Sequence, residues 1–423
     1  MITQMILFVI VAIILYLYSL RGIFIFTRKI KNIRIRKNII LSYWLLDVAF
    51  IVFSIFWIII IRTSEWPDFV KYRNYFYISG AFSLIYFPKF AFVPFVFLND
   101  LRSLFILAVK RVNFPGNRLK NLVEKKSKFN VLLSFGILCS TIVFFLVIYG
   151  IVIGKSNFKV TEKEIYFENL PPSFDGLVLA HISDTHLGGF SNKGNVYKGI
   201  EKIAKNEPDI VLFTGDLINN QAKEGKPYAE AFNKLTPQLG KYSVLGNHDI
   251  GDYRRWYMIE DKDPDIKSVE DLHEQMGFEL LRNNNTFIIQ EDDSIMIAGV
   301  DSWGLPPFEK TGDLSEAVSP YNDFNFIVLL THDPTHWSEE VLGKENIRLT
   351  LSGHTHGIQF GVTYGNIKWS PAKYIYEYWY GLYKHNNQYL YVNPGFGFVG
   401  LPLRVVMPPE ITIITLKSGD GGK

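Results

Sequence analysis

The sequence predicts a chain in two parts: an N-terminal α-helical transmembrane region of about four spans, residues 1–154, followed by a layered α/β domain. Three observations support this. Four apolar stretches of bilayer length occupy the first part. That part carries 19 Lys+Arg against 5 Asp+Glu, and the remainder carries 25 against 36. After residue 164, short apolar runs alternate with helical stretches.

The formal net charge of +3 is therefore the sum of two unlike parts, +14 in front and −11 behind. This division excludes a single homogeneous soluble domain. A hydrophobic content of 48% also excludes a disordered chain, because so many apolar side chains can bury a large core.

The four predicted spans are about Met5–Leu20, Ile39–Ile61, Tyr75–Leu98 and Val131–Ile153. The first is interpreted as an uncleaved anchor, because it lacks the basic start and the cleavage site of a signal peptide and is followed by Arg21. The third is interrupted by Pro88, Lys89 and Pro94. A re-entrant hairpin there, or a fifth span at Leu101–Val109, remains an alternative.

Basic residues in the connections predict the orientation. Segments 21–38, 62–74 and 99–130 carry seven, three and eight Lys/Arg. The positive-inside rule makes the first and third of them cytoplasmic, so everything after residue 154 is predicted to be extracytoplasmic. Either alternative for the third stretch reverses the predicted side of the membrane for the residues after 154. The basic segments are interpreted as topogenic charge rather than as patches for nucleic acid or anionic lipid.

Two charged residues, Asp47 and Lys89, lie inside predicted spans. At ~1.5 Å of rise per residue both are roughly 12–14 Å from the cytoplasmic ends of antiparallel helices. Because an unpaired charge at that depth is costly, we expect the two to pair across the helices. The alternative is that each snorkels or faces a wet groove.

The second part alternates strand and helix. Helical stretches are expected at Val196–Asn206 and Tyr228–Leu239, and residues 155–163 are expected to be a polar tether ahead of a domain over 164–418 and a tail over 419–423. In such α/β sheets, ligands collect at the carboxyl ends of the strands. The expected strands are Leu177–Ile182, Ile210–Thr214, Tyr242–Leu245, Ile295–Val300, Phe326–Leu330, Leu349–Ser352 and Ile411–Leu416.

Five polar blocks follow these strands directly. As candidate metal ligands they supply two Asp, one Asn and up to five His. The only cysteine, Cys139, lies inside an apolar run, so neither a disulfide nor a Cys-based zinc site is possible. Imidazole and carboxylate donors suit Mn, Fe, Zn, Co or Ni better than Mg or Ca. The blocks are Ser183-Asp184-Thr185-His186, Thr214-Gly215-Asp216, Gly246-Asn247-His248-Asp249, Thr331-His332-Asp333 and Ser352-Gly353-His354-Thr355-His356.

This ordered set, D-x-H, G-D, G-N-H-D, H and G-H-x-H, resembles the calcineurin-like metallophosphoesterase superfamily. The downstream sequence is similar to a membrane-associated bacterial branch of it, and the resemblance covers about residues 160–418. The downstream motifs are Gly381-Leu382-Tyr383, Asn393-Pro394-Gly395, Gly400-Leu401-Pro402-Leu403-Arg404 and Pro409-Glu410-Ile411.

The resemblance implies a binuclear metal centre in a four-layer α/β sandwich. Carried over motif by motif, one divalent metal is held by Asp184, His186, Asp216 and His356. The other is held by Asp216, Asn247, His332 and His354, so that Asp216 bridges the two. His248 is then a general acid rather than a ligand. Manganese is the expected metal, with Fe, Zn, Co or Ni as alternatives.

Two positions depart from the family pattern. Many relatives have G-D-x-x-D, whose second Asp supports the catalytic His, and here that position is Asn219. We therefore expect protonated His248 to be less stabilised, unless Asp249 or another acid replaces that charge. Asn219→Asp is expected to raise the basic limb of the pH–rate profile. The second departure is Ile358, where the membrane branch usually has Gly.

Other His and aromatic residues are given structural interpretations. His181 is expected in the core, His336 at the start of a helix, and His273 and His385 on the surface. Trp303, Trp337, Trp369 and the run Tyr374–Tyr383 form either a lipid-contacting rim or ordinary core.

The function predicted from the sequence is a membrane-anchored, metal-dependent phosphohydrolase, a phosphodiesterase or pyrophosphatase acting on a lipid-linked or envelope phosphoester. The resemblance implies a nucleotide-sugar lipid such as UDP-diacylglucosamine as one candidate, although that substrate is met on the cytoplasmic side. Membrane lipids and the phosphoester are the expected partners. One alternative is a nuclease or phosphoprotein phosphatase, but the −11 balance opposes a nucleic-acid partner. Another is a non-catalytic membrane sensor or transporter.

Overall fold

The computed structural model describes residues 2–64, 68–111, 130–251, 262–304, 306, 308–321, 324–344, 346–364 and 367–420. The chain divides into two compact units. The first comprises Met1–Trp66 and Asn74–Tyr149, and the second comprises Pro67–Arg73 and Gly150–Lys423.

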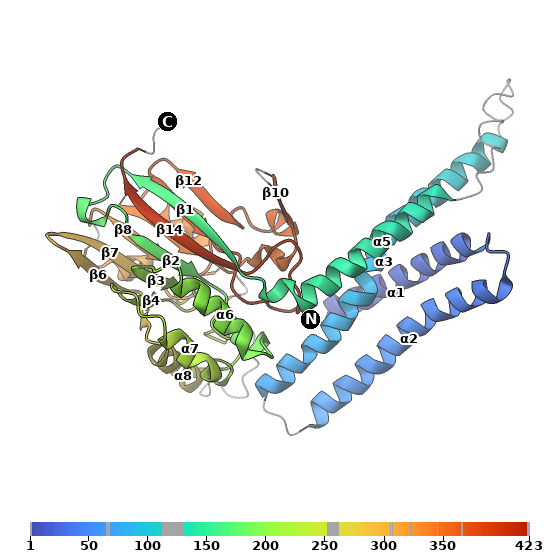
Figure 1. The fold of residues 1–423 in the computed structure, drawn as a ribbon, viewed down its shortest axis with the longest axis horizontal. Helices are drawn as coiled ribbons and strands as arrows, with labels where there is room; N and C mark the ends of the chain where they lie inside the picture. Colours follow the sequence, from blue (N-terminus) through green and yellow to red (C-terminus); the bar gives the residue numbers. More distant parts are fainter. Residues whose placement is uncertain are drawn as a thin grey trace. The chain divides into compact units, whose positions relative to one another are not determined.

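The first unit is built from long apolar helices (Figure 1). Among the described residues, four helices are long and apolar enough to cross a membrane. They are α1 (Ile2–Thr27), α2 (Ile33–Thr63), α3 (Asp68–Arg111) and α5 (Val131–Val152). The Asn32 side chain accepts hydrogen bonds from the Arg34 and Ile35 N–H groups and so caps the start of α2. The number of predicted spans is therefore confirmed.

Helix α3 runs without interruption for 44 residues with Pro88 and Pro94 inside it. The alternative of a re-entrant hairpin is therefore wrong, and Leu101–Val109 continues α3 instead of forming a span of its own. Proline removes one backbone hydrogen bond but does not end a helix when neighbouring groups satisfy the freed carbonyl. Ser140 of α5 also bonds to the helix at this point, because its Oγ donates to the Pro88 carbonyl at 2.9 Å.

Asp47 and Lys89 pair inside this unit. Lys89 Nζ of α3 donates a hydrogen bond to Asp47 Oδ1 of α2, and the two residues are only 6% and 4% exposed. The rings of Tyr16, Tyr43 and Tyr86 lie 5.4, 5.0 and 4.8 Å from the ammonium group. The pairing prediction is confirmed, and the low exposure excludes snorkelling. Ion pairing with surrounding π faces is the arrangement expected for a charge held in an apolar medium.

The second unit contains two six-stranded sheets (Figure 1). The first has the order β1-β14-β2-β3-β4-β5, with β2 to β5 mutually parallel. Its strands are β1 (Lys159–Phe167), β14 (Glu410–Ser418), β2 (Val178–Ile182), β3 (Ile210–Phe213), β4 (Lys241–Ser243) and β5 (Glu279–Leu280).

The second sheet has the order β12-β13-β9-β8-β7-β6, with β13, β9, β8 and β7 parallel. A separate hairpin pairs β10 (Val362–Tyr364) with β11 (Ile367–Trp369). The strands of the second sheet are β12 (Gly381–His385), β13 (Gln388–Val392), β9 (Ile347–Ser352), β8 (Ile327–Leu330), β7 (Asp293–Gly299) and β6 (Asn284–Gln290).

The main core lies between the two sheets. Buried residues of both contribute to one cluster, for example Leu179 and Leu212 of the first sheet with Ile297 and Leu351 of the second. Alternate residues of the same strands face outward, because side chains in a strand alternate between its two faces. Burying both faces explains why these strands read as continuous apolar runs.

Helices cover the outer faces. On the first sheet lie α6 (Lys193–Ala204), α7 (Ala229–Asn233) and α8 (Lys262–Gln275) (Figure 1). Helix α6 buries Val196, Gly199, Ile200 and Ile203, the i, i+3, i+4, i+7 spacing of one helix face. On the second sheet, α9 (Leu314–Val318) and a π-helical turn (Trp337–Val341) pack on Met296 and Leu329. The predicted four-layer α/β sandwich is confirmed.

Several boundaries differ from prediction. Residues 159–163, expected in the tether, are the first half of β1 and pair with β14, so the sandwich begins before residue 164. Helix α7 ends at Asn233 and not at Leu239. Strands β5, β6 and β10 to β13 were not predicted.

Candidate metal centre

The five polar blocks lie at the carboxyl ends of parallel neighbouring strands, three in the first sheet and two in the second. Asp184 and His186 follow β2, Asp216 follows β3, and Asn247 and His248 follow β4. The second sheet contributes His332 after β8 and His354 and His356 after β9. All seven predicted ligands and the predicted acid are therefore brought to the carboxyl ends of their strands, where α/β proteins place their sites.

The backbone at this edge is held in an unusual conformation. Asp184, His186, Asp216, His354 and His356 all have positive φ values, between 42° and 69°. Non-glycine residues rarely adopt this left-handed region, and where they do it is commonly at functional sites. The turns after β2, β3 and β9 use this conformation, which aims their side chains at a common point.

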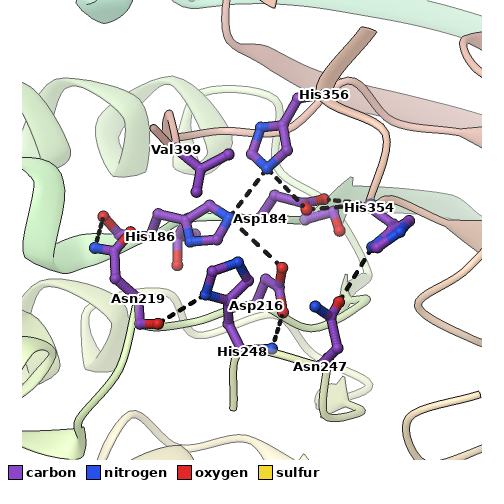
Figure 2. A network of polar contacts seen from close by, with 12 residues as sticks. Asp184, His186, Asp216, Asn219, Asn247, His248, His354, His356 and Val399 are labelled. Atoms are coloured by element: carbon purple, nitrogen blue, oxygen red, sulfur yellow. Dashed lines mark hydrogen bonds and ion pairs between the residues drawn. The ribbon is translucent and has the colours of Figure 1, made fainter. Parts of the chain in front are cut away.

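One group of donors comprises Asp184, His186 and His356 (Figure 2). His186 Nε2 lies 3.0 Å from His356 Nε2, and His356 Nε2 lies 3.2 Å from Asp184 Oδ1. Burial lowers the pKa of His186 well below its usual range, so its ring is neutral. A neutral imidazole is the form that binds a metal ion.

The second group comprises Asp216, His332 and His354, with Asn247 beside it. His332 Nε2 lies 3.2 Å from Asp216 Oδ2 and 3.2 Å from His354 Nδ1. Asn247 Oδ1 lies 3.1 Å from the same His354 nitrogen (Figure 2). Asp216 Oδ2 is also 3.5 Å from His186 Nε2, so this carboxylate faces both groups.

This donor set fits two metal ions. In each group two imidazole nitrogens face each other, 3.0–3.2 Å apart, and a carboxylate oxygen lies next to them. All these side chains are buried or nearly so. Buried lone pairs pointing at one another are unfavourable unless a cation or proton lies between them. Oxygen and imidazole donors without thiolates match Mn, Fe, Zn, Co or Ni.

Further contacts orient the ligand rings. His332 Nδ1 donates to the Thr214 carbonyl at 2.7 Å, which leaves Nε2 to face Asp216. His356 Nδ1 lies 3.2 Å from Nη2 of Arg404, a side chain only 1% exposed that also donates to the Gly397 and Pro394 carbonyls. Arg404 is the last residue of the downstream motif at 400–404, to which no role was assigned from the sequence.

His248 lies beside the first group of donors, but it is not one of the imidazoles that face each other in pairs. Its main-chain N–H donates to Asp216 Oδ1 at 2.9 Å, and its Nδ1 donates to the main-chain carbonyl of Asn219 at 2.7 Å (Figure 2). Its ring is 4.7 Å from that of His186, edge to face. Burial lowers the pKa of His248.

The group that orients His248 is not the side-chain carboxylate expected from the family pattern. The Asn219 side chain points to Glu224, with Nδ2 3.2 Å from Glu224 Oε2, so the residue acts on His248 through its main-chain oxygen. A charge at side-chain position 219 would meet Glu224 instead of the imidazole. Glu224, which sequence reasoning missed, accepts the N–H groups of Asn219, Asn220 and Gln221 at 2.7, 3.0 and 3.1 Å.

Asp249 braces the backbone. Its carboxylate accepts hydrogen bonds from the N–H groups of Asp216, Leu217 and Gly246 at 2.8, 2.9 and 3.0 Å. Asp249 therefore joins the loop after β3 to the loop after β4 and fixes the direction in which Asp216 points. Holding these two loops together is a different role from the one expected from the sequence, in which Asp249 replaces the negative charge that Asn219 cannot supply.

The remaining His residues mostly behave as predicted. His181 is fully buried and bonds to Thr214 Oγ1 at 2.9 Å, and His385 is exposed. His336 directly precedes the π-helical turn and bonds through Nδ1 with Thr331 Oγ1, next to the predicted ligand His332. The surface assignment of His273 is wrong: it is fully buried and bonds to Ser243 at 2.9 Å.

The aromatic residues divide between the two interpretations. Trp303 and Trp337 are buried in the core of the second sheet. Tyr374, in contrast, is 73% exposed. Tyr376, two residues later, places its hydroxyl 3.4 Å from His354 Nε2.

A four-helix membrane unit joined to a two-sheet sandwich with overlapping clusters of His and Asp defines a class, membrane-anchored metallohydrolases. Comparison with known proteins agrees. Residues 177–357 match the calcineurin-like phosphoesterase family, and residues 2–155 match a probable transmembrane domain of calcineurin-like phosphoesterases.

Individual relatives match between 62% and 96% of the chain. A transmembrane protein with metallophosphoesterase domain from Danio rerio is 30% identical over 316 residues, 71% of this chain and 68% of that protein. The uncharacterized metallophosphoesterase YkuE of Bacillus subtilis is 32% identical over 62% of this chain and 86% of its own length. An uncharacterized metallophosphoesterase of Campylobacter jejuni, Cj0846, is 26% identical over 96% of this chain and 97% of its own.

The chain therefore belongs to the calcineurin-like metallophosphoesterases. It is a multi-pass membrane protein and a metal-dependent hydrolase of phosphoesters, from a family that uses binuclear metal centres.

Proposed function

We propose that this protein hydrolyses a P–O bond of a lipid-linked phosphodiester or pyrophosphate at a binuclear centre. The observation that carries the proposal is the convergence of two donor clusters on one carboxylate, Asp216, whose Oδ2 lies 3.2 Å from His332 Nε2 and 3.5 Å from His186 Nε2. In this proposal Asp184, His186, Asp216 and His356 hold one metal, and Asp216, Asn247, His332 and His354 hold the other. Manganese is the metal we propose, with Fe, Zn, Co or Ni as alternatives.

Two cations held by these residues would supply charge neutralisation at the phosphoryl oxygens and a water molecule that is nucleophilic at neutral pH. The protein's own groups supply the rest. Asp249 and the Thr214 carbonyl fix Asp216 and His332, so the ligands are already oriented before substrate binds.

We assign the leaving-group step to His248. Its Nδ1 is held by the Asn219 carbonyl, which directs the opposite ring nitrogen, Nε2, toward the site. A protonated imidazole at that place donates its Nε2 proton to the oxygen that departs from phosphorus, and the Asn219 carbonyl stabilises the ring in that charged form.

The lipid-linked substrate is proposed because the catalytic unit is covalently joined to four membrane helices. A nuclease is less favoured, because the part of the chain after residue 154 has 36 acidic against 25 basic residues, a balance that repels a nucleic-acid backbone. A purely binding protein is less favoured because the ligand set is complete and buried.

The proposed side of the membrane is extracytoplasmic. Four spans place the N-terminus and the catalytic unit on the same side, and the basic connections at 21–38 and 99–130 on the other. A reporter fused after β14, active only in the periplasm or only in the cytoplasm, tests this. Activity of the cytoplasmic reporter would reverse the assignment and allow a nucleotide-sugar lipid of the UDP-diacylglucosamine type.

Hydrolysis of bis-p-nitrophenyl phosphate by the full-length protein tests the chemistry. We expect turnover that requires a divalent metal and falls by at least about 100-fold in His332→Ala. The matched control is His385→Ala, because His385 is exposed on β12. Equal activity of the two variants would contradict the proposed centre.

A further inference from the structure

We propose that an apolar rim beside the metal centre binds the hydrocarbon tail of the substrate, which makes the substrate a phosphoester with a long alkyl or acyl chain. This inference rests on the proposed function and names its substrate class from a separate observation. The rim consists of Ile358, Phe360, Val362, Tyr374, Ile375 and Val406.

Exposed apolar side chains are concentrated in this rim. Among described residues from Gly154 onward, eight large apolar side chains are exposed, and six of them are the rim residues. The other two are Ile289 on the edge strand β6 and Tyr321. Single exposed apolar residues are ordinary, but a contiguous group next to a site marks a binding surface.

Each rim segment also carries a residue that contacts the centre. Ile358 lies two residues after His356 in the same short helical segment. Tyr374 and Ile375 directly precede Tyr376, whose hydroxyl lies 3.4 Å from His354 Nε2.

The third segment carries Val406, two residues after Arg404, whose Nη2 lies 3.2 Å from His356 Nδ1. Each rim segment is therefore linked, within two residues along the chain, to a side chain at the centre, and the proposed hydrocarbon tail would extend along the rim from a phosphoryl group held there.

Backbone contacts join the rim segments into one surface. Gly361 N–H donates to the Val405 carbonyl at 3.3 Å, and Val405 N–H donates to the Gln359 carbonyl at 3.0 Å. The Gln359 side chain in turn bonds both the N–H and the carbonyl of Val399, which Figure 2 shows at the site. On the other side, Ser370 Oγ donates to the Gly357 carbonyl at 2.6 Å.

Two rim residues are held in a conformation that their side chains disfavour. Ile358 has φ of 50° and Val406 has φ of 61°, and both are β-branched. Such residues are genuine outliers in the left-handed region, where glycine fits best. Because both side chains are exposed, 38% and 45%, burial in the folded protein does not explain them. Strain kept at a site's edge indicates a functional contact.

Charge at the rim agrees with a lipid phosphoester. Lys373 Nζ lies 5.0 Å from the centre of the Tyr374 ring, and exposed Lys368 lies on the adjoining strand β11. Lysines among exposed aromatic and aliphatic side chains are typical of surfaces that meet an anionic headgroup and an apolar chain together. Membrane anchoring keeps such molecules at high local concentration.

The test uses three p-nitrophenyl phosphodiesters that differ only in the second ester: methyl, butyl or octyl. Hydrolysis adds water, breaks the P–O bond to the aryl group and releases p-nitrophenolate, so the same colour reports every reaction. Full-length protein in nanodiscs of fixed lipid content, with Mn²⁺, is compared with three variants. They are the double variant Tyr374→Ser/Ile375→Ser, Ile358→Gly, and the matched control Ile289→Ser.

The quantity compared is the ratio of kcat/KM for the octyl and methyl esters, because partitioning into the bilayer is the same for all variants. We expect the ratio to fall about tenfold in the double variant, the effect of returning roughly two methylene groups to water. Ile358→Gly, which suits the observed φ and so retains the fold, is expected to lower it too, and Ile289→Ser to keep it.

Two failures are distinguishable. An unchanged ratio in both rim variants, with all esters hydrolysed, overturns the rim proposal alone. Failure of the unsubstituted protein to hydrolyse even the methyl ester with any divalent metal overturns the proposed function.

Discussion

The Nδ1 of His248 lies 2.7 Å from the main-chain carbonyl oxygen of Asn219, while the side chain of Asn219 points the other way, to Glu224. The imidazole is therefore oriented by a peptide carbonyl and not by a carboxylate. The carbonyl is itself fixed, because the Glu224 carboxylate accepts hydrogen bonds from the N–H groups of three successive residues, Asn219 to Gln221.

Glu224→Gln is predicted to impair the function of His248 indirectly, through the Asn219 carbonyl that orients the imidazole. An amide cannot accept all three N–H groups, so the Asn219 carbonyl shifts and His248 loses its orientation. We expect kcat to fall about tenfold for a diester with an alkoxide leaving group, and less for p-nitrophenolate, which needs little protonation. Asn219→Ala, which keeps the carbonyl, is the control and should lose much less. Equal losses on both leaving groups would show that Glu224 acts only on stability.

Asn219→Asp is predicted to destabilise the protein rather than to improve catalysis. The new carboxylate lies about where Nδ2 now stands, 3.2 Å from Glu224 Oε2, in a fully buried place. Burial already raises the pKa of Glu224 to about 7, so a second carboxyl beside it must either repel the charged form of Glu224 or stay protonated. Either outcome costs about 1–3 kcal/mol of unfolding free energy at neutral pH. Thermal unfolding and the pH–rate profile check this. A raised basic limb with unchanged stability would restore the expectation drawn from the sequence.

The ion pair in the membrane unit gives a prediction for a double-mutant cycle. Asp47→Asn or Lys89→Gln alone leaves a buried charge without its partner, and about 3–5 kcal/mol of stability should be lost in each case. The double variant should lose clearly less than the sum of the two, and unfolding in detergent measures all three. Additive losses would mean that the two side chains do not interact in the membrane.

His273 gives a prediction for the pH dependence of stability. Burial lowers the pKa of His273 to about 3, whereas the unfolded side chain titrates near 6.5. Between these values the unfolded chain binds more protons, so the free energy of unfolding decreases as pH falls, by up to about 1.4 kcal/mol per pH unit.

His273→Leu should remove this part of the slope between about pH 6.5 and 4. The lost bond to Ser243 lowers stability equally at every pH, so only the slope is diagnostic. His385→Leu, at an exposed position, is the matched control. A slope that is the same in His273→Leu and in the unsubstituted protein would contradict the burial of a neutral imidazole.

Sequence reasoning reached the parts of this structure that have a local signature. Apolar runs of bilayer length gave the four spans, and polar blocks directly after strands gave all seven convergent side chains and His248. The Asp47–Lys89 pair was also predicted, because both depths could be measured along helices of known rise.

The features that were missed lack a side-chain pattern in the sequence that would mark them. Glu224 and Arg404 act through main-chain groups, which no side-chain motif records. His273 was placed on the surface because its helix is polar overall, yet Phe213 and Phe278 cover its ring. The first half of strand β1 was predicted to be a polar tether, because its outer residues are exposed at the edge of the first sheet.

The central claim is that Asp216 joins two metal sites built from both sheets. The most direct measurement is the metal content of purified full-length protein and of Asp216→Asn, together with bis-p-nitrophenyl phosphate hydrolysis. We predict about two divalent ions per chain in the unsubstituted protein, with turnover lost on chelation and restored by Mn²⁺. In Asp216→Asn both metal content and turnover should fall. Folded protein that binds no Mn, Fe, Zn, Co or Ni, or Asp216→Asn with full metal content and turnover, would contradict the account.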